Sequence, residues 1–233
     1  MSDPLSRVSR MKSFDASRML SFDLETTGTN PHATRIVTSS LLRIDGSSVD
    51  TTELLADPGV EIPESATAIH GITTEYAQQH GRPHEEVLAD TIARIRDAWR
   101  QDMALIVFNA PYDLTVLRSL EPSFTVDGLV FDPLLIDRAM DRYRRGKRTL
   151  SALCEHYRIT LDNAHNSSAD ALAAARIAWK QVRTWPELQS YSMEELMEFQ
   201  AVKYYEIQSE FREWREKRGQ DASTVSTSWP VQG

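Results

Sequence analysis

The hydrophobic and polar positions along the chain predict short buried strands at its front and helices between and behind them. Apolar runs that suit strands are found at 19–25, 35–44, 49–55, 103–110 and 128–132. The turn Asp45-Gly46-Ser47 joins the second run to the third as an antiparallel hairpin. Apolar positions with a helical period are found at 85–100, 111–120, 133–143, 149–157 and 168–184. This order of elements predicts an α/β fold built on a mixed sheet.

The last helix has clear boundaries in the sequence. Ser192 and Glu195 form a capping box at its start, and Gly219 is suited to end it. Apolar or long side chains recur along it in alternating steps of four and three residues, at 193, 197, 200, 204, 207, 211 and 214. This seam favours docking on the same domain or on a like subunit over a short coiled coil.

These elements divide the chain into four parts. Residues 1–17 are polar and show no periodic pattern of apolar positions, which predicts a flexible arm. Residues 18–184 contain the predicted sheet and its helices and form one predicted domain. Residues 185–219 form a helical extension. Residues 220–233 are rich in Ser, Thr and Gly and predict a disordered tail.

Composition narrows the possible environments of the chain. With 233 residues and 41% apolar residues, it can bury a sizeable core, while its net charge of −8 argues weakly against a polyanion as partner. Cys154 is the single cysteine, so no intrachain disulfide is possible. No apolar stretch approaches the roughly 20 residues of a membrane span. We therefore expect a cytoplasmic protein without a membrane partner.

Two carboxylates interrupt the first apolar run. Asp23 and Glu25 are two residues apart, so their side chains share one face of the strand at its C-terminal end. Asp113 and Asp170 each fall in the first turn of a predicted helix. Taken singly, the strand acids could pair with basic residues, and the helix acids suit the helix dipole. Taken together, the four acids lie where an α/β sheet gathers its ligand site, and carboxylates are the ligands that Mg²⁺ and Mn²⁺ prefer.

A histidine accompanies the last of these acids. His165 lies five residues before Asp170, and beside a metal site its near-neutral pKa suits a general base. Three segments now stand out, "FDLETTG", "NAPYD" and "HNSSAD". In order and spacing they resemble the three exonuclease motifs of the DEDDh family of 3′→5′ exonucleases, which includes the proofreading epsilon subunit of bacterial DNA polymerase III. The resemblance covers roughly residues 18–184.

The resemblance implies a ribonuclease H-like fold, with a five-stranded mixed sheet that has one antiparallel strand and flanking helices. It also implies two divalent cations, Mg²⁺ or Mn²⁺. Asp23, Glu25 and Asp170 would hold the first cation, Asp23 would bridge to the second, and Asp113 would support it. His165 would deprotonate the attacking water.

The same resemblance suggests residues that bind the terminal nucleotide. Thr26, Thr27 and Gly28 would meet the last sugar, and Asn109 would line the groove. His70, in "AIHGIT", would approach the last bases, although a loop histidine that satisfies backbone groups is an equal alternative.

Local positive charge is found in the segment "RYRRGKR", residues 142–148. A solvated helix end is one explanation, because cations suit helix C-termini. We favour a loop that follows the phosphates of a nucleic acid, with Arg144, Arg145 and Lys147 as its contacts.

The sequence therefore predicts a metal-dependent 3′→5′ exonuclease that removes nucleoside 5′-monophosphates from the 3′ ends of DNA, preferably single-stranded, in replication or repair. Two alternatives stay open: an RNA-directed exoribonuclease similar to RNase T or oligoribonuclease, and a non-catalytic binding module of the same fold. Thr38 stands where many family members have Glu. The helix at 192–218 would contact a second copy of the chain or a polymerase or replication partner.

Overall fold

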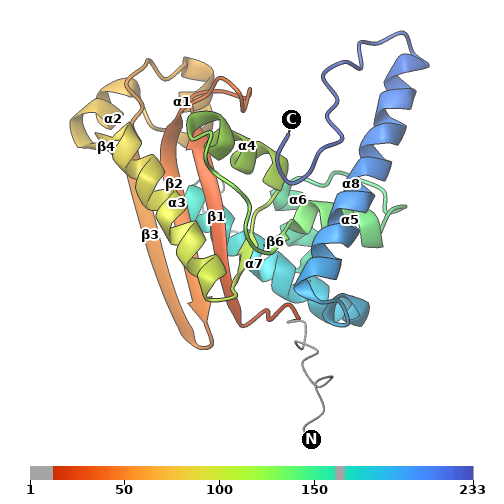
Figure 1. Cartoon of the computed structure of the whole chain (residues 1–233). Helices are drawn as coiled ribbons and strands as arrows, with labels where there is room; N and C mark the ends of the chain where they lie inside the picture. The colour runs from red at the N-terminus through yellow and green to blue at the C-terminus, as the bar shows by residue number, and fades with distance from the viewer. Residues whose placement is uncertain (1–12, 161–165, 233) are drawn as a thin grey trace, which may run out of the picture.

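The computed structural model describes residues 13–160 and 166–232. Its centre is a six-stranded sheet of order β4-β3-β2-β1-β5-β6 (Figure 1). The strands are β1 (Arg18–Thr26), β2 (Ile36–Asp45), β3 (Ser48–Asp57), β4 (Arg82–Pro83), β5 (Ala104–Ile106) and β6 (Val130–Phe131). Strand β2 is antiparallel to both of its neighbours, and the other pairs are parallel. The mixed sheet with one antiparallel strand is thus confirmed.

The strand count differs from the predicted five. The added strand, β4, has two residues and pairs with the end of β3. A strand this short carries no readable alternation of apolar and polar positions, so the hydrophobic pattern could not predict it.

Eight α-helices and one short 3₁₀ helix are found in the described part of the chain. They are α1 (Glu64–His70), α2 (Thr74–His80), α3 (His84–Arg100), α4 (Ala110–Leu120), α5 (Pro133–Met140), α6 (Leu150–Tyr157), α7 (Ser167–Thr184), the 3₁₀ helix η1 (Pro186–Gln189) and α8 (Met193–Glu216). The apolar pattern predicted no helix where α1 lies. Local capping explains the difference, because Gly71 takes a left-handed conformation (φ 76°) that ends α1 after only seven residues.

Alternate side chains of β1 separate the two layers of helices. Leu20, Phe22 and Leu24 belong to the core beneath α3 and α4. Met19 packs on the other side of the sheet with the alanines of α7, which are Ala171, Ala174, Ala175 and Ala178, each at most 1% exposed. Because alanine is small, α7 approaches the sheet closely on the face that also carries Asp23 and Glu25.

Helix α8 begins as predicted, with the reciprocal capping box of Ser192 and Glu195. Its first half docks on the edge of the sheet. The Gln200 side chain is fully buried, donates to the carbonyl of Val130 (2.8 Å) and accepts from the N–H of Asp132 (2.8 Å). This amide therefore bonds to the outer edge of β6 as a further strand would. Docking on the same domain is confirmed for this half of the helix.

The end of the chain differs from the predicted disordered tail. After α8 the chain turns back in irregular conformation toward α4 (Figure 1). Trp229 and Val231 pack against the core, and the N–H of Gln232 donates to Thr115 Oγ1 (2.9 Å). Two apolar side chains suffice to anchor a segment whose average composition is polar. No helix in residues 13–160 and 166–232 is long and apolar enough to cross a membrane.

Candidate active site

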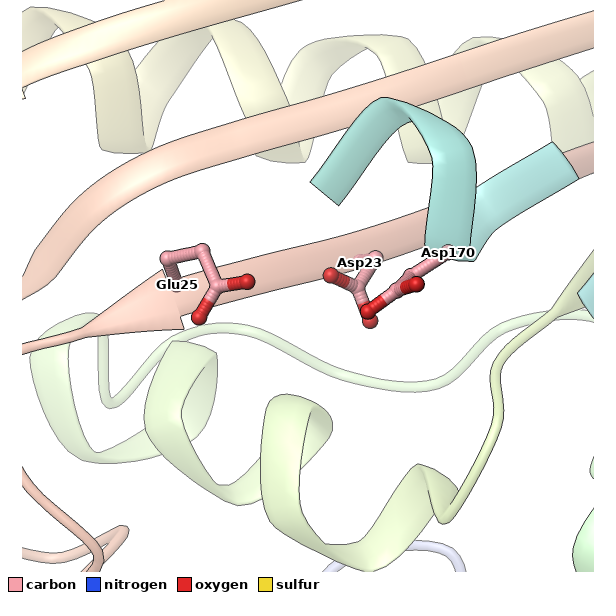
Figure 2. Close-up of side chains that lie close together, drawn as sticks. All are labelled: Asp23, Glu25 and Asp170. Carbon is pink, nitrogen blue, oxygen red and sulfur yellow. The ribbon is translucent and has the colours of Figure 1, made fainter. Parts of the chain in front are cut away.

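Three of the predicted acids meet where β1 ends and α7 begins. Asp23 and Glu25 project from β1, and Asp170 comes from the first turn of α7 (Figure 2). One carboxylate oxygen from each residue lies within 4.8 Å of the others. Three carboxylates at this separation can share one hard cation through oxygen ligands.

Hydroxyl groups hold the start of α7 on the sheet. Ser167 Oγ bonds to Ser40 Oγ (2.6 Å) and Thr38 Oγ1 (3.1 Å) on β2, and Ser21 Oγ on β1 donates to the carbonyl of Ala171 (2.6 Å). These bonds fix the turn of α7 that carries Asp170. Thr38, the departure from the family pattern, thus serves here as an anchor for α7.

Asp113 reaches the site from α4. Its Oδ1 accepts from the N–H of Leu24 (3.1 Å), so the carboxylate sits against the backbone between Asp23 and Glu25. Asp113 and Asp23 line one cavity of about 640 Å³. Asp113 is outside the group of three acids that lie within 4.8 Å, as a supporting residue would be.

A buried aspartate that sequence reasoning missed fixes the start of α4. Asp132 accepts from the backbone N–H groups of Asn109 (3.0 Å) and Ala110 (3.0 Å), and also from those of Leu134 and Leu135 in α5. It therefore ties together the N-termini of two helices. Asp followed by Pro at a helix start, as in "FDP", is a capping signal that marks Asp132, but its bonds to α4 depend on the fold.

Burial and the proximity of other carboxylates raise the pKa values of three of these acids. Desolvation, together with repulsion from Asp113 and Glu25, raises the pKa of Asp23 well above its ordinary value. Desolvation followed by repulsion from Asp170 raises the pKa of Glu25 to about 7. Desolvation raises the pKa of Asp113 to about 8. Carboxyl groups perturbed in this way and gathered at the end of one strand mark a candidate site for a cation.

The predicted nucleotide-binding turn follows β1 directly. The hydroxyls of Thr26 and Tyr112 lie within hydrogen-bonding distance of each other and of the carbonyl of Gly28, so that one can donate to the carbonyl while the other donates to its neighbour. Thr27 Oγ1 bonds to Thr34 Oγ1 (3.1 Å). Tyr112, which the sequence did not single out, therefore ties this turn to α4.

The remaining predicted residues divide into those near the cavity and those elsewhere. Asn109 lines the cavity in a left-handed conformation (φ 65°), and Lys147 lines it on the basic side. His70 lies beside the backbone of Thr26, and desolvation lowers its pKa. Arg145 is exposed. His165 falls outside the described residues.

Arg144 pairs with an acid of its own chain. Its guanidinium pairs with Asp137 (2.6 Å), a fully buried carboxylate that also contacts Arg148 and accepts from Tyr157 Oη (2.8 Å). A buried carboxylate needs such partners, so Arg144 turns inward and supports the loop. Its expected phosphate contact stays a prediction.

A comparison of the sequence with known protein families identifies the family to which the chain belongs. The model of the family described as Exonuclease (RNase_T) matches residues 20–178, which include all four acids. The chain belongs to the exonuclease family. The expected family resemblance is thereby confirmed, together with the nuclease character of the fold.

Curated relatives of this exonuclease are much longer proteins. The chain is 29% identical over 175 residues to a PolC-type DNA polymerase III of Halalkalibacterium halodurans, which covers 72% of the chain and 11% of the relative. It is 31% identical over 173 residues to a DNA polymerase III subunit epsilon-like protein of Rhodobacter capsulatus (66% and 22%). It is 26% identical over 172 residues to the 3′-5′ exonuclease DinG of Staphylococcus epidermidis (71% and 18%). The chain thus spans between a tenth and a quarter of these relatives.

Solved structures agree with the exonuclease assignment. The zinc-bound complex of Escherichia coli exonuclease I with single-stranded DNA matches with a TM-score of 0.61 and 25% identity, over 75% of this chain and 42% of that one. The complex of the same enzyme with a dA16 oligonucleotide matches with a TM-score of 0.60 and 25% identity, over the same shares.

Proposed function

We propose that this exonuclease is a divalent-metal-dependent 3′→5′ enzyme that hydrolyses the terminal phosphodiester bond of DNA, preferably single-stranded, and releases nucleoside 5′-monophosphates in replication or repair. The observation that carries the proposal is the set of three carboxylates within 4.8 Å of one another, contributed by β1 and α7. Residues 18–184 form the catalytic domain in this proposal, with 185–219 as its extension.

The donor set fits a pair of hard cations, Mg²⁺ or Mn²⁺. Asp23, Glu25 and Asp170 would hold one cation, and Asp23 with Asp113 would hold the other. When bound, such cations stabilise the charge on the attacking and leaving oxygens of an in-line displacement. The proton of the attacking water goes to His165, whose imidazole is a suitable base at neutral pH.

The protein contributes position as well as charge. The Thr26–Gly28 turn, held by Tyr112, supports the terminal sugar beside the cations. Lys147 and Arg138 line the same cavity as Asp23 and Asp113. A phosphate in this cavity meets both the cations and the basic side chains, which favours the transition state of phosphate hydrolysis.

The test is digestion of 5′-labelled single-stranded DNA with Mg²⁺ or Mn²⁺. The parent chain should give a ladder that shortens from the 3′ end. Asp23→Asn and Asp170→Asn should each lower the rate by roughly 10²–10³-fold or more, whereas Asp127→Asn, at an exposed site, should leave it unchanged. Internal cuts would reject the exonuclease polarity, and absence of products with either metal would favour a binding module. A matched RNA strand that is digested faster would reject the DNA preference.

The second half of α8 supports a proposal about partners. Tyr205, Phe211 and Trp214 are exposed there, at 59%, 42% and 45%. An exposed aromatic face of this kind suits a second copy of the chain or a polymerase partner. Light scattering across a range of concentrations tests the first, because a dimer doubles the measured mass and a monomer excludes it.

A further inference from the structure

A second basic surface lies on the exposed side of α7, away from the acids. Trp179 forms its centre and lines two adjoining hollows of about 710 and 520 Å³. The cationic side chains that line these hollows are Arg158, Arg176, Lys180 and Arg183. We call these five residues the Trp179 surface.

The charge of this surface stands out in an acidic chain. None of its four cations forms an ion pair with a carboxylate in the part of the chain that the structure describes. Within residues 13–160 and 166–232, Asp15 is the one acid that lines the two hollows, and it accepts from the N–H and hydroxyl of Ser17. A chain with a net charge of −8 thus gathers four cationic side chains here, which suits a polyanion.

The tryptophan adds an aromatic platform to this charge. Trp179 is 39% exposed, an unusual state for so large a side chain. The guanidinium of Arg183 lies 3.4 Å from the centroid of its ring, and Lys180 Nζ lies 5.7 Å from it. Exposed aromatic rings among cations are how proteins bind single-stranded nucleic acids, since bases stack on the ring while phosphates meet the cations.

The position of this surface relates it to the acids. Asp170 and Trp179 belong to the same helix, nine residues apart, which corresponds to about 14 Å along its axis. Met19 lines the larger hollow and lies on the same face of β1 as Asp23. Nine residues also turn the helix by about 180°, so Trp179 lies on the opposite side of α7 from Asp170 and a strand has to pass around the helix. At 3.4 Å per stacked nucleotide, the axial distance alone corresponds to about four nucleotides, which is the shortest path.

We propose that the Trp179 surface binds a single-stranded nucleic acid at least about four nucleotides upstream of the 3′ end. This inference rests on the proposed function, since that function places the 3′ end at the acids. A base stacks on Trp179, and Arg158, Arg176 and Lys180 contact phosphates. The enzyme consequently holds long strands more tightly than very short ones.

The test compares a 12-nucleotide with a 3-nucleotide DNA strand, each also made as RNA. Trp179→Ala should raise the KM for the 12-mer about five- to tenfold, the loss expected from one stacked base, and leave the KM for the 3-mer unchanged. Trp179→Phe should keep the KM for the 12-mer close to that of the parent, because phenylalanine also offers a ring for stacking. Tyr76→Ala is the matched control, because Tyr76 is a similarly exposed aromatic residue (52%) on α2, to which no binding role is assigned.

Binding is measured separately, by fluorescence anisotropy in the Asp23→Asn background. Neutralising Arg176 and Lys180 should reduce the salt dependence of 12-mer binding by about 0.7 in the logarithmic slope for each lost phosphate contact. A parent that digests both strands, combined with a Trp179→Ala variant that shows no length-dependent loss, overturns the inference and leaves the proposed function standing. A parent that binds the 12-mer through Trp179 without digesting it rejects that function, and it also overturns the inference, because the 3′ end is then no longer placed at the acids. If the parent binds neither the DNA 12-mer nor the RNA 12-mer, the inference is overturned.

Discussion

At the scale of single residues, the candidate site consists of carboxyl groups that hold their protons unusually tightly. Glu25 has a pKa of about 7 and Asp113 of about 8, and in both cases desolvation is the largest cause. A proton must leave each group before a cation can bind through it. We therefore expect the affinity of the site for divalent cations to increase between pH 6 and pH 8.

The same upward pKa shifts affect stability. Their effect on the free energy of unfolding is opposite to that of an acid whose pKa is lowered by a salt bridge. The pKa of Glu25 rises from its ordinary value of 4.5 to about 7 on folding. As the pH increases through this interval, the unfolded chain releases the proton first. The unfolded state therefore binds fewer protons, and the free energy of unfolding decreases. Without metal, the protein should be more stable at pH 5 than at pH 8.

Asp113→Asn tests this prediction at one residue. Asparagine keeps an acceptor for the N–H of Leu24 but carries no charge. At pH 8 in EDTA, the variant should melt about 2–4 °C above the parent, the effect of about 1 kcal/mol in a chain of this length, and at pH 4.5 it should match the parent. Scanning calorimetry at both pH values measures the difference. Asp127→Asn serves as control, and equal shifts at both pH values would contradict the explanation.

At the scale of elements, contacts between α8 and the edge strand β6 contribute to the placement of Asp113. Gln200 bonds to the backbone of β6, Asp132 follows β6, and Asp132 fixes the start of α4, which carries Asp113. An element outside the predicted catalytic domain thus contributes to the placement of one acid.

Gln200→Leu should disrupt this support. It leaves the buried N–H of Asp132 and the carbonyl of Val130 without their side-chain partner, which costs about 1–3 kcal/mol for each unsatisfied group. The variant should lose stability and should require more Mg²⁺ for half-maximal activity, because α4 carries Asp113. Chemical denaturation and a metal titration of activity measure the two effects. Gln79→Leu, at an exposed position of α2, is the control. A destabilised variant with an unchanged metal requirement would limit Gln200 to a role in folding.

The sequence predicted most of the elements but few of the contacts between them. The capping box of Ser192 and the two-residue spacing of Asp23 and Glu25 are local features, and the structure has both. The two-residue strand β4 carries too few residues for a pattern. The partners of Asp132 and of Arg144 lie in other elements, so only the folded chain brings them together.

At the scale of the whole molecule, the last residues belong to the folded body. Trp229 and Val231 pack beside α4, on the core that supports the site. Polar composition suggested a disordered tail, because an average over the segment does not register two well-placed apolar side chains.

Truncation after Gln220 tests this contribution. Removing the packed segment exposes apolar surface of α4 and leaves the hydroxyl of Thr115 without the bond from Gln232. The melting temperature should fall by about 4–8 °C, which corresponds to about 2 kcal/mol at this size. Removing residue 233 alone is the matched control. An unchanged melting temperature would show that the segment contributes nothing to stability.

The alanines of α7 have a consequence for which ions the site accepts. Because Ala171, Ala174 and Ala175 allow the helix to lie close to β1, the gap between Asp170 and the strand acids is set by side-chain volume in the core. A larger residue at Ala174, such as valine, pushes the helix outward and widens the ring of oxygens. Small cations such as Mg²⁺ require short, regular ligand distances, whereas Ca²⁺ accepts longer ones. We therefore expect apolar residues that never touch the ion to influence which divalent cation the candidate site accepts.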